Sequence, residues 1–111
     1  MAVYKEEDSI YEVLEEGKLA RRIKGYHGSL MMVEVYFENY CISEEHSHVH
    51  EQMTYCLEGT FDFYVEGRTY RVQAGDTIYF PSNVSHHCAV ISKKGRLLDV
   101  FTPIREDFLQ V

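Results

Sequence analysis

The segment from Tyr55 to Phe80, "YCLEGTFDFYVEGRTYRVQAGDTIYF", constrains the fold more strongly than any other part of the chain. Apolar and polar residues alternate in it, as at Phe61, Asp62 and Phe63, and this pattern predicts strands with one buried and one solvated face. Glycine-containing pairs interrupt the alternation where the chain must reverse: Glu58-Gly59, Glu66-Gly67 and Gly75-Asp76. The segment therefore predicts successive antiparallel hairpins in an all-β domain.

The same pattern continues on both sides of this segment. Further strands are predicted at 19–26, 29–37, 86–91 and 96–102. A turn is predicted at 93–95, residues 9–18 suit either a short helix or an edge strand, and the tail after Pro103 is predicted to make one helical turn. About nine or ten short strands must then pack as one closed or nearly closed β-unit, either a small barrel or a double-sheet jelly roll.

The length and composition are those of one globular domain. A chain of 111 residues is close to the common domain size, so we expect a single domain over residues 1–111. The apolar stretch "LMMVEVYF" is cut by Glu34 and is far shorter than the roughly 18 residues of a membrane-spanning helix. The N-terminus has no basic segment followed by an apolar run, which predicts a cytoplasmic protein with no membrane partner.

The net charge of -7 opposes binding to nucleic acids. The clusters of basic residues are too small for a nucleic-acid-binding surface. The pair Arg21-Arg22 is interpreted as solvated turn and strand residues. The three cysteines form no C-x-x-C pair, which predicts buried free thiols and no disulfide framework.

Three histidines fall within five residues of the stretch "EEHSHVHEQ", residues 44–52. On an extended strand His46 and His48 point to the same side, and imidazole is the commonest side-chain ligand for first-row metals. Gln52 follows four residues later, and His86 comes after a turn-like segment further along the chain. Because a β-barrel brings separated strand ends together, these four side chains could form one preformed metal pocket.

The spacing of these residues resembles the two sequence motifs of the cupin family. The first motif is matched by His46, His48 and Gln52 followed by Gly59, and the second by Gly75, Pro81 and His86. The chain is thus similar to a small single-domain cupin with a motif core of about 40–102. This resemblance implies an all-β cupin barrel, a homodimer, and one divalent transition metal (nickel, zinc, iron or manganese) held by His46, His48, Gln52 and His86.

The match to the cupin motifs has departures. Tyr40 and Asn83 stand where the motifs often have glycine, which affects loop shape. Gln52 stands where a glutamate is usual, and a neutral amide leaves the metal its full double positive charge, favouring anionic ligands and Lewis-acid chemistry. His50 is expected to turn away from the site, and His87 to point to the face opposite that of His86.

A second site signal lies in "LLDVFTPIRED", residues 97–107. Asp99 and Phe101 share one strand face, and Arg105 follows Pro103. Spacing alone favours an ordinary ion pair between Asp99 and Arg105. The segment also resembles the cupin subgroup that contains the pectin-degradation protein which linearises unsaturated uronates. That resemblance implies that Asp99 and Arg105 are catalytic and that Phe101 and Arg105 bind substrate.

The function implied is the metal-dependent conversion of 4,5-unsaturated monouronates to linear keto-uronates, with a small anionic sugar as the substrate. Two other classes are consistent with the same residues. One is a non-catalytic binding or sensor module for a small ligand, and the other is a metal-dependent dioxygenase of a small organic acid.

Overall fold

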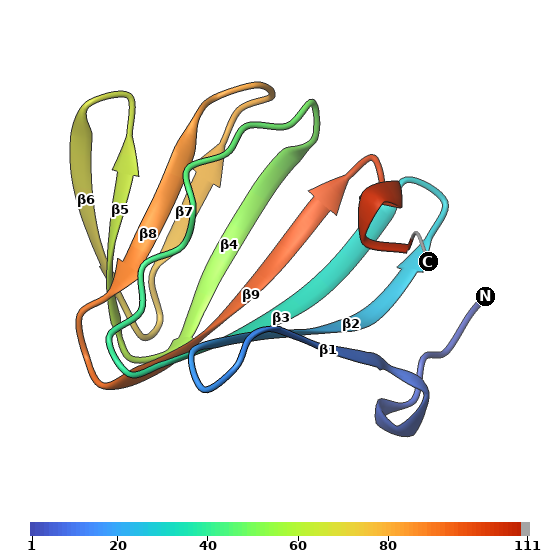
Figure 1. Cartoon of the computed structure of the whole chain (residues 1–111). Helices are drawn as coiled ribbons and strands as arrows, with labels where there is room; N and C mark the ends of the chain where they lie inside the picture. Colours follow the sequence, from blue (N-terminus) through green and yellow to red (C-terminus); the bar gives the residue numbers. More distant parts are fainter. Residues whose placement is uncertain (110–111) are drawn as a thin grey trace.

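The computed structural model describes residues 1–109, which form nine β-strands and two short 3-10 turns (Figure 1). The strands are β1 Ile10–Glu15, β2 Leu19–His27, β3 Leu30–Glu38, β4 Glu51–Glu58, β5 Thr60–Val65, β6 Arg68–Gln73, β7 Thr77–Phe80, β8 His86–Val90 and β9 Lys94–Thr102. The 3-10 turns are η1 Glu6–Asp8 and η2 Glu106–Leu109. None of the helical segments within 1–109 is long and apolar enough to cross a membrane.

Two elements that the sequence left open or misplaced are now defined. The segment 9–18 contains the edge strand β1 and no helix. The turn predicted at 93–95 was wrong in position, because β9 already begins at Lys94 and Gly95 pairs with Phe37 of β3. Glycine is suited to this strand position because a Cβ atom at Gly95 would lie only 2.6 Å from the Phe61 ring.

The strands form two antiparallel sheets that face each other (Figure 1). The larger sheet has the order β1-β2-β3-β9-β4-β7, and the smaller has the order β6-β5-β8. The segment before β4 runs beside β8, where Ile42 pairs with Ala89 and His46 pairs with His86. This double-sheet architecture confirms the predicted all-β cupin barrel.

The interior contains two apolar clusters and a group of buried polar residues. In one cluster Phe37 packs edge to face on Phe61, with ring centroids 5.0 Å apart. The second cluster contains Ile23, Met31, Val33 and Phe101. The buried polar residues found within 1–109 are Gln52, Thr54, His86, Asp99 and Arg105. Because buried polar groups need partners, this group marks the functional region of the barrel.

Several loop positions have a left-handed backbone. Tyr40 and Asn83 have φ angles of 55° and 66°, and both stand where the cupin motifs often have glycine. The backbone of these loops therefore keeps the conformation that glycine would favour, although the side chains differ. The three cysteines are buried and unpaired within residues 1–109, as predicted.

Candidate metal and anion site

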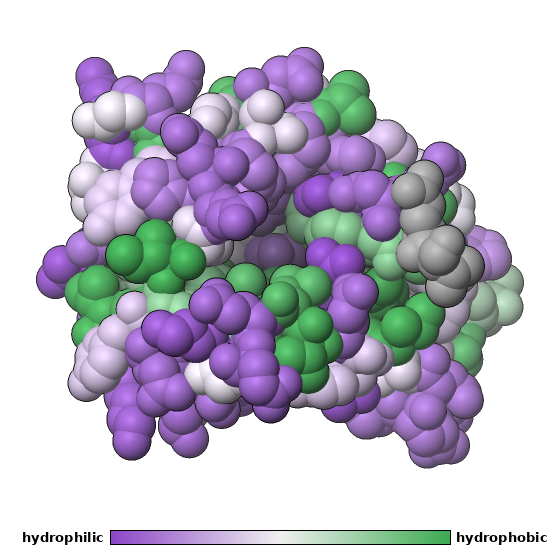
Figure 2. All heavy atoms as spheres, in the orientation of Figure 1, coloured by the Kyte–Doolittle hydropathy of each residue, from purple (hydrophilic) through white to green (hydrophobic). Residues whose placement is uncertain are grey.

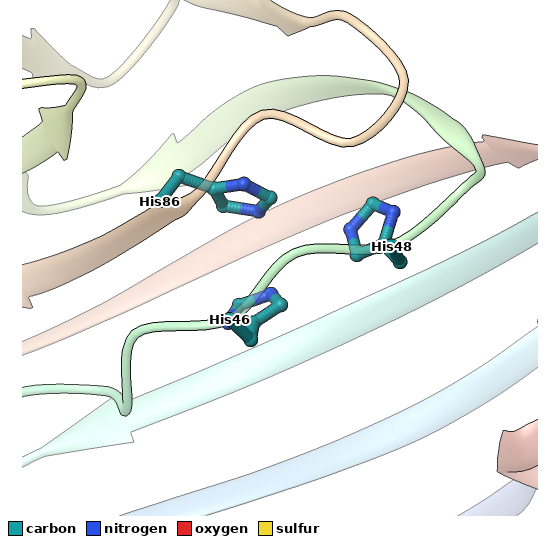
Figure 3. Close-up of side chains that lie close together, drawn as sticks. All are labelled: His46, His48 and His86. Carbon is teal, nitrogen blue, oxygen red and sulfur yellow. The ribbon is translucent and has the colours of Figure 1, made fainter.

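Three histidines from distant parts of the chain lie close together, with His86 buried and His46 exposed (Figure 3). His46 and His48 lie on the segment that leads into β4, and His86 is the first residue of β8. Each offers a ring nitrogen, and these atoms all lie within 4.8 Å of one another. The backbone bridge between His46 and His86 fixes the two strands that carry them. The structure therefore brings the three predicted histidine ligands together.

Backbone carbonyl groups set the orientation of all three rings. Each Nδ1 lies 2.9 Å from a carbonyl oxygen two residues away: Glu44 for His46, His50 for His48 and Val84 for His86. A carbonyl oxygen only accepts hydrogen bonds, so each Nδ1 carries the proton and each Nε2 keeps its lone pair. This is the arrangement that outer hydrogen bonds give to metal-binding imidazoles.

The protonation state of the buried rings also suits metal binding. Burial lowers the pKa of His86 to about 4. Burial, and in second place the charge of Arg105, lowers the pKa of His48. At neutral pH both rings are therefore uncharged, which is the form that binds metal.

Gln52 is the fourth predicted ligand, and its carbonyl side faces the histidines. Its Oε1 lies 3.1 Å from His48 Nε2. Since His48 Nδ1 holds the ring proton, both of these atoms are acceptors, and a cation between them would satisfy both. In addition, His86 Nε2 is buried and has no hydrogen-bond partner within residues 1–109. These two observations show that the residues present fit a divalent metal.

A directed hydrogen-bond chain links this site to Asp99 on β9. Gln52 Nε2 donates to Thr54 Oγ1 at 2.8 Å, and Thr54 Oγ1 donates to Asp99 Oδ1 at 2.7 Å. The Asp99 carboxylate accepts, so the direction of each bond is determined and the Gln52 carbonyl must point toward the histidines. Burial raises the pKa of Asp99 to about 6, although Thr54 and Arg105 oppose the shift.

The predicted substrate residues line the same cavity. The cavity has a volume of about 430 Å³ and is bordered by His46, His86, Asp99, Phe101 and Arg105, among others. Figure 2 shows a hollow in the middle of this face, surrounded by both hydrophilic and hydrophobic side chains. The volume lies within the usual range for small-molecule sites.

The ion pair predicted from spacing between Asp99 and Arg105 was wrong. Arg105 instead donates two parallel hydrogen bonds to Asp107, from Nε to Oδ1 at 3.0 Å and from Nη2 to Oδ2 at 2.8 Å. The turn η2 brings Asp107 back toward Arg105, and this geometry is the bidentate one that guanidinium groups favour. Asp99 therefore stays hydrogen-bonded to Thr54, and Arg105 acts on it only through its charge.

The other two histidines near the motifs lie outside the triad. His50 Nε2 bonds to the carbonyl oxygen of Ile104 at 3.1 Å. His87 points away from His86 and stacks on Tyr64, with ring centroids 4.8 Å apart. Both placements agree with the predicted directions of these side chains.

One residue of the cavity was missed from the sequence. Arg21, interpreted as solvated, lines the cavity, and only 16% of its side chain is exposed. It shares a face of β2 with Leu19 and buried Ile23. This parity with two apolar neighbours was the signal that could have placed Arg21 inside the barrel.

The fold and the site define the class of protein. A model of the cupin domain family matches residues 33–101, and the chain belongs to this family. Among curated proteins it is similar to the pectin degradation protein KdgF of Dickeya dadantii (strain 3937). The two are 31% identical over 105 residues, which are 94% of each chain.

Two solved structures are similar over most of the chain. The structure of KdgF from Halomonas sp. has a TM-score of 0.86 and 26% identity, covering 96% of this chain and 99% of that one. An RmlC-like cupin from Shewanella frigidimarina NCIMB 400 has a TM-score of 0.84 and 34% identity, covering 94% and 92%. Both KdgF proteins are thus similar to this chain over nearly its whole length.

Proposed function

We propose that this cupin converts a 4,5-unsaturated monouronate into the linear keto-uronate, with a divalent metal held by His46, His48, Gln52 and His86. The proposal draws on the similarity to KdgF over nearly the whole chain. The observation that carries it is the buried Asp99 carboxyl, which shares one cavity with Arg105 and with His46 and His86 of the triad. A carboxyl group with a pKa of about 6 can both accept and return a proton near neutral pH.

The reaction is an isomerisation and needs no co-reactant. A proton leaves the anomeric hydroxyl as the bond between C1 and the ring oxygen breaks, and a proton is added at C4. C1 becomes an aldehyde and C5 a ketone. In this proposal Asp99 transfers the proton, Arg105 holds the substrate carboxylate, and the Phe101 ring packs against the sugar.

Four uncharged ligands would leave a bound divalent metal its full charge, and the metal would then supply Lewis-acid polarisation of substrate oxygens. Through one hydroxyl, Thr54 orients the Gln52 carbonyl toward the histidine triad and holds Asp99, which lines the cavity. His86 and Gln52 are nearly inaccessible to solvent, whereas His46 is exposed and leaves the site open on its side.

The test is to incubate the metal-loaded protein with unsaturated galacturonate and to follow the loss of its ultraviolet absorbance. We expect a decay that Asp99→Asn abolishes, because an amide cannot transfer the proton. Wild-type protein that binds the uronate with no turnover above buffer would replace this proposal by a non-catalytic binding module. Oxygen uptake with substrate and iron in the purified protein would instead favour a dioxygenase.

Metal binding can be measured independently of any enzymatic activity. Elemental analysis of untagged protein should find one transition metal per chain, and chelation should lower the melting temperature, since a ligand of the folded state stabilises it. His86→Ala should remove both the bound metal and the effect of the chelator. A melting temperature that chelation leaves unchanged would contradict the metal site.

We also propose that the protein forms a homodimer through the β1 edge of the larger sheet. All six residues of β1 are exposed, including the apolar side chains of Ile10, Tyr11, Val13 and Leu14. An edge strand with apolar residues on both faces invites pairing with a second copy. Sedimentation or light scattering at several concentrations measures the mass directly.

A further inference from the structure

Arg21 has an unsatisfied donor in the wall of the cavity. Its Nη2 pairs with Glu12 Oε1 at 2.6 Å, but its Nε is buried and has no hydrogen-bond partner within residues 1–109. Guanidinium groups are seldom buried with a donor unused, because the lost hydration is not replaced. The Arg21 guanidinium is therefore incompletely paired at a position that lines the cavity.

A second guanidinium lies on the same aromatic ring. The guanidinium carbon of Arg21 lies 3.8 Å from the centroid of the Phe108 ring, and that of Arg105 lies 4.1 Å from it. Both arginines line the cavity, and η2 brings Phe108 to them. Two positive groups held on one ring repel each other unless an anion joins them.

The carboxylates already present leave room for that anion. Asp107 occupies Nε and Nη2 of Arg105, and Glu12 occupies Nη2 of Arg21. The side chains of Glu12 and Asp107 are half exposed, so water screens their charge. A carboxylate inside the cavity would be less screened, so it would compete well with Glu12 for the Arg21 guanidinium.

Ring contacts connect the two arginines to the histidine triad. Phe101 packs on His48 at 5.7 Å between ring centroids, Arg105 lies 5.1 Å from the Phe101 ring, and both Arg105 and Arg21 lie on the Phe108 ring. A hexuronate could place its carboxylate at the arginines while its several hydroxyl groups face other parts of the same cavity, whereas glycolate has only one hydroxyl group to offer.

We propose that Arg21 is a second carboxylate-binding residue, which together with Arg105 holds the acid group of a hexuronate and selects it over a neutral sugar or a short acid. The proposal deepens the function proposed above and rests on it for the choice of a uronate. It assigns Arg21 to binding and not to proton transfer, so the substitution Arg21→Gln should raise KM and leave kcat nearly unchanged.

The experiment uses the full-length, zinc-loaded protein labelled with nitrogen-15 and titrated with saturated D-galacturonate. The Arg21 Nε–H resonance, assigned by its absence in Arg21→Lys, should shift saturably with galacturonate and not with D-galactose or glycolate. Arg21→Gln should weaken galacturonate binding by roughly tenfold or more, as expected for the loss of charged hydrogen bonds. Wild-type protein whose Arg21 resonance does not move, or moves equally with glycolate, overturns the assignment.

Arg22→Gln is the matched control. Arg22 is the next residue on β2, and it contacts Ser9 and the Tyr36 hydroxyl, away from the cavity. This control should bind galacturonate within about twofold of wild type, as surface substitutions usually do. The two proposals fail separately. Galacturonate bound through Arg21 without turnover of the unsaturated sugar refutes the reaction alone, whereas turnover with an unchanged KM in Arg21→Gln refutes the role of Arg21 alone.

Discussion

Replacing Thr54 by valine tests the hydrogen-bond chain behind the metal site with little change of shape. Thr54 is fully buried, and its hydroxyl accepts from Gln52 and donates to Asp99. Valine keeps the side-chain volume but removes both bonds. A neutral bond contributes about 0.5–1.5 kcal/mol to stability and a bond to a charged group about 1.5–3 kcal/mol.

The loss is expected near the lower end of that combined range. Gln52 already helps to lower the pKa of Asp99, so its amide can turn part of its donor capacity to that carboxylate. We therefore expect Thr54→Val to reduce the free energy of unfolding by about 2 kcal/mol. For a domain of this size the melting temperature should fall by roughly 8–10 °C.

The assay is urea denaturation of metal-free protein, because a bound metal would add its own stabilisation. Thr54→Ser keeps the hydroxyl and should retain most of the stability. Thr77→Val, at an exposed position of β7, should change stability by less than about 0.5 kcal/mol. If Thr54→Val is as stable as wild type, the chain through Thr54 does not stabilise the fold and the reasoning fails.

Three further predictions concern other parts of the molecule. Tyr40→Gly should raise the free energy of unfolding, measured in urea, by about 1 kcal/mol, because exposed Tyr40 has a positive φ that glycine adopts without strain. Asn83→Gly should change it little, since asparagine tolerates a positive φ. Equal effects of the two substitutions would argue against backbone strain at Tyr40. Burial raises the pKa of the Cys56 thiol above its value in the unfolded chain, which is about 8.5. The protonated thiol therefore contributes fully to stability below the unfolded pKa, and this contribution is lost as pH rises through the folded pKa. The urea midpoint should fall between about pH 8 and pH 10 by less in Cys56→Ala than in wild type, and equal falls would contradict this. Val13→Lys, on β1, should convert the proposed dimer to a monomer in sedimentation, and an unchanged mass would exclude β1 as the interface.

Much of the fold was predictable because the chain repeats one physical pattern. Alternation of apolar and polar residues defined most strands, and the cupin spacing predicted which strand ends meet. What alternation could not decide was β1, where every residue is exposed, and the start of β9, where Gly95 sits inside a strand. Both depend on neighbouring strands and not on local preference.

The site was predictable in its residue types more than in its contacts. The triad and Gln52 follow from motif spacing, but the partner of Arg105 does not, because Asp107 reaches it only after the turn η2 forms. Thr54 carried no signal of its own, since a threonine in a strand is ordinary. Its role appears only when β4 is paired with β9, which places Thr54 opposite Asp99.

The single hydroxyl proton of Thr54 makes the side chains at positions 52 and 99 dependent on each other. The hydroxyl can donate to only one neighbour, so one flanking side chain must be an acceptor and the other must bring a donor. Gln52 with Asp99 satisfies this rule, and so would glutamate with asparagine in the reverse direction. A glutamate at 52 beside an ionised Asp99 would not. A more usual acidic metal ligand at position 52 would therefore require either a protonated Asp99 or a substitution at position 99, and either change would alter the proposed proton-transfer group.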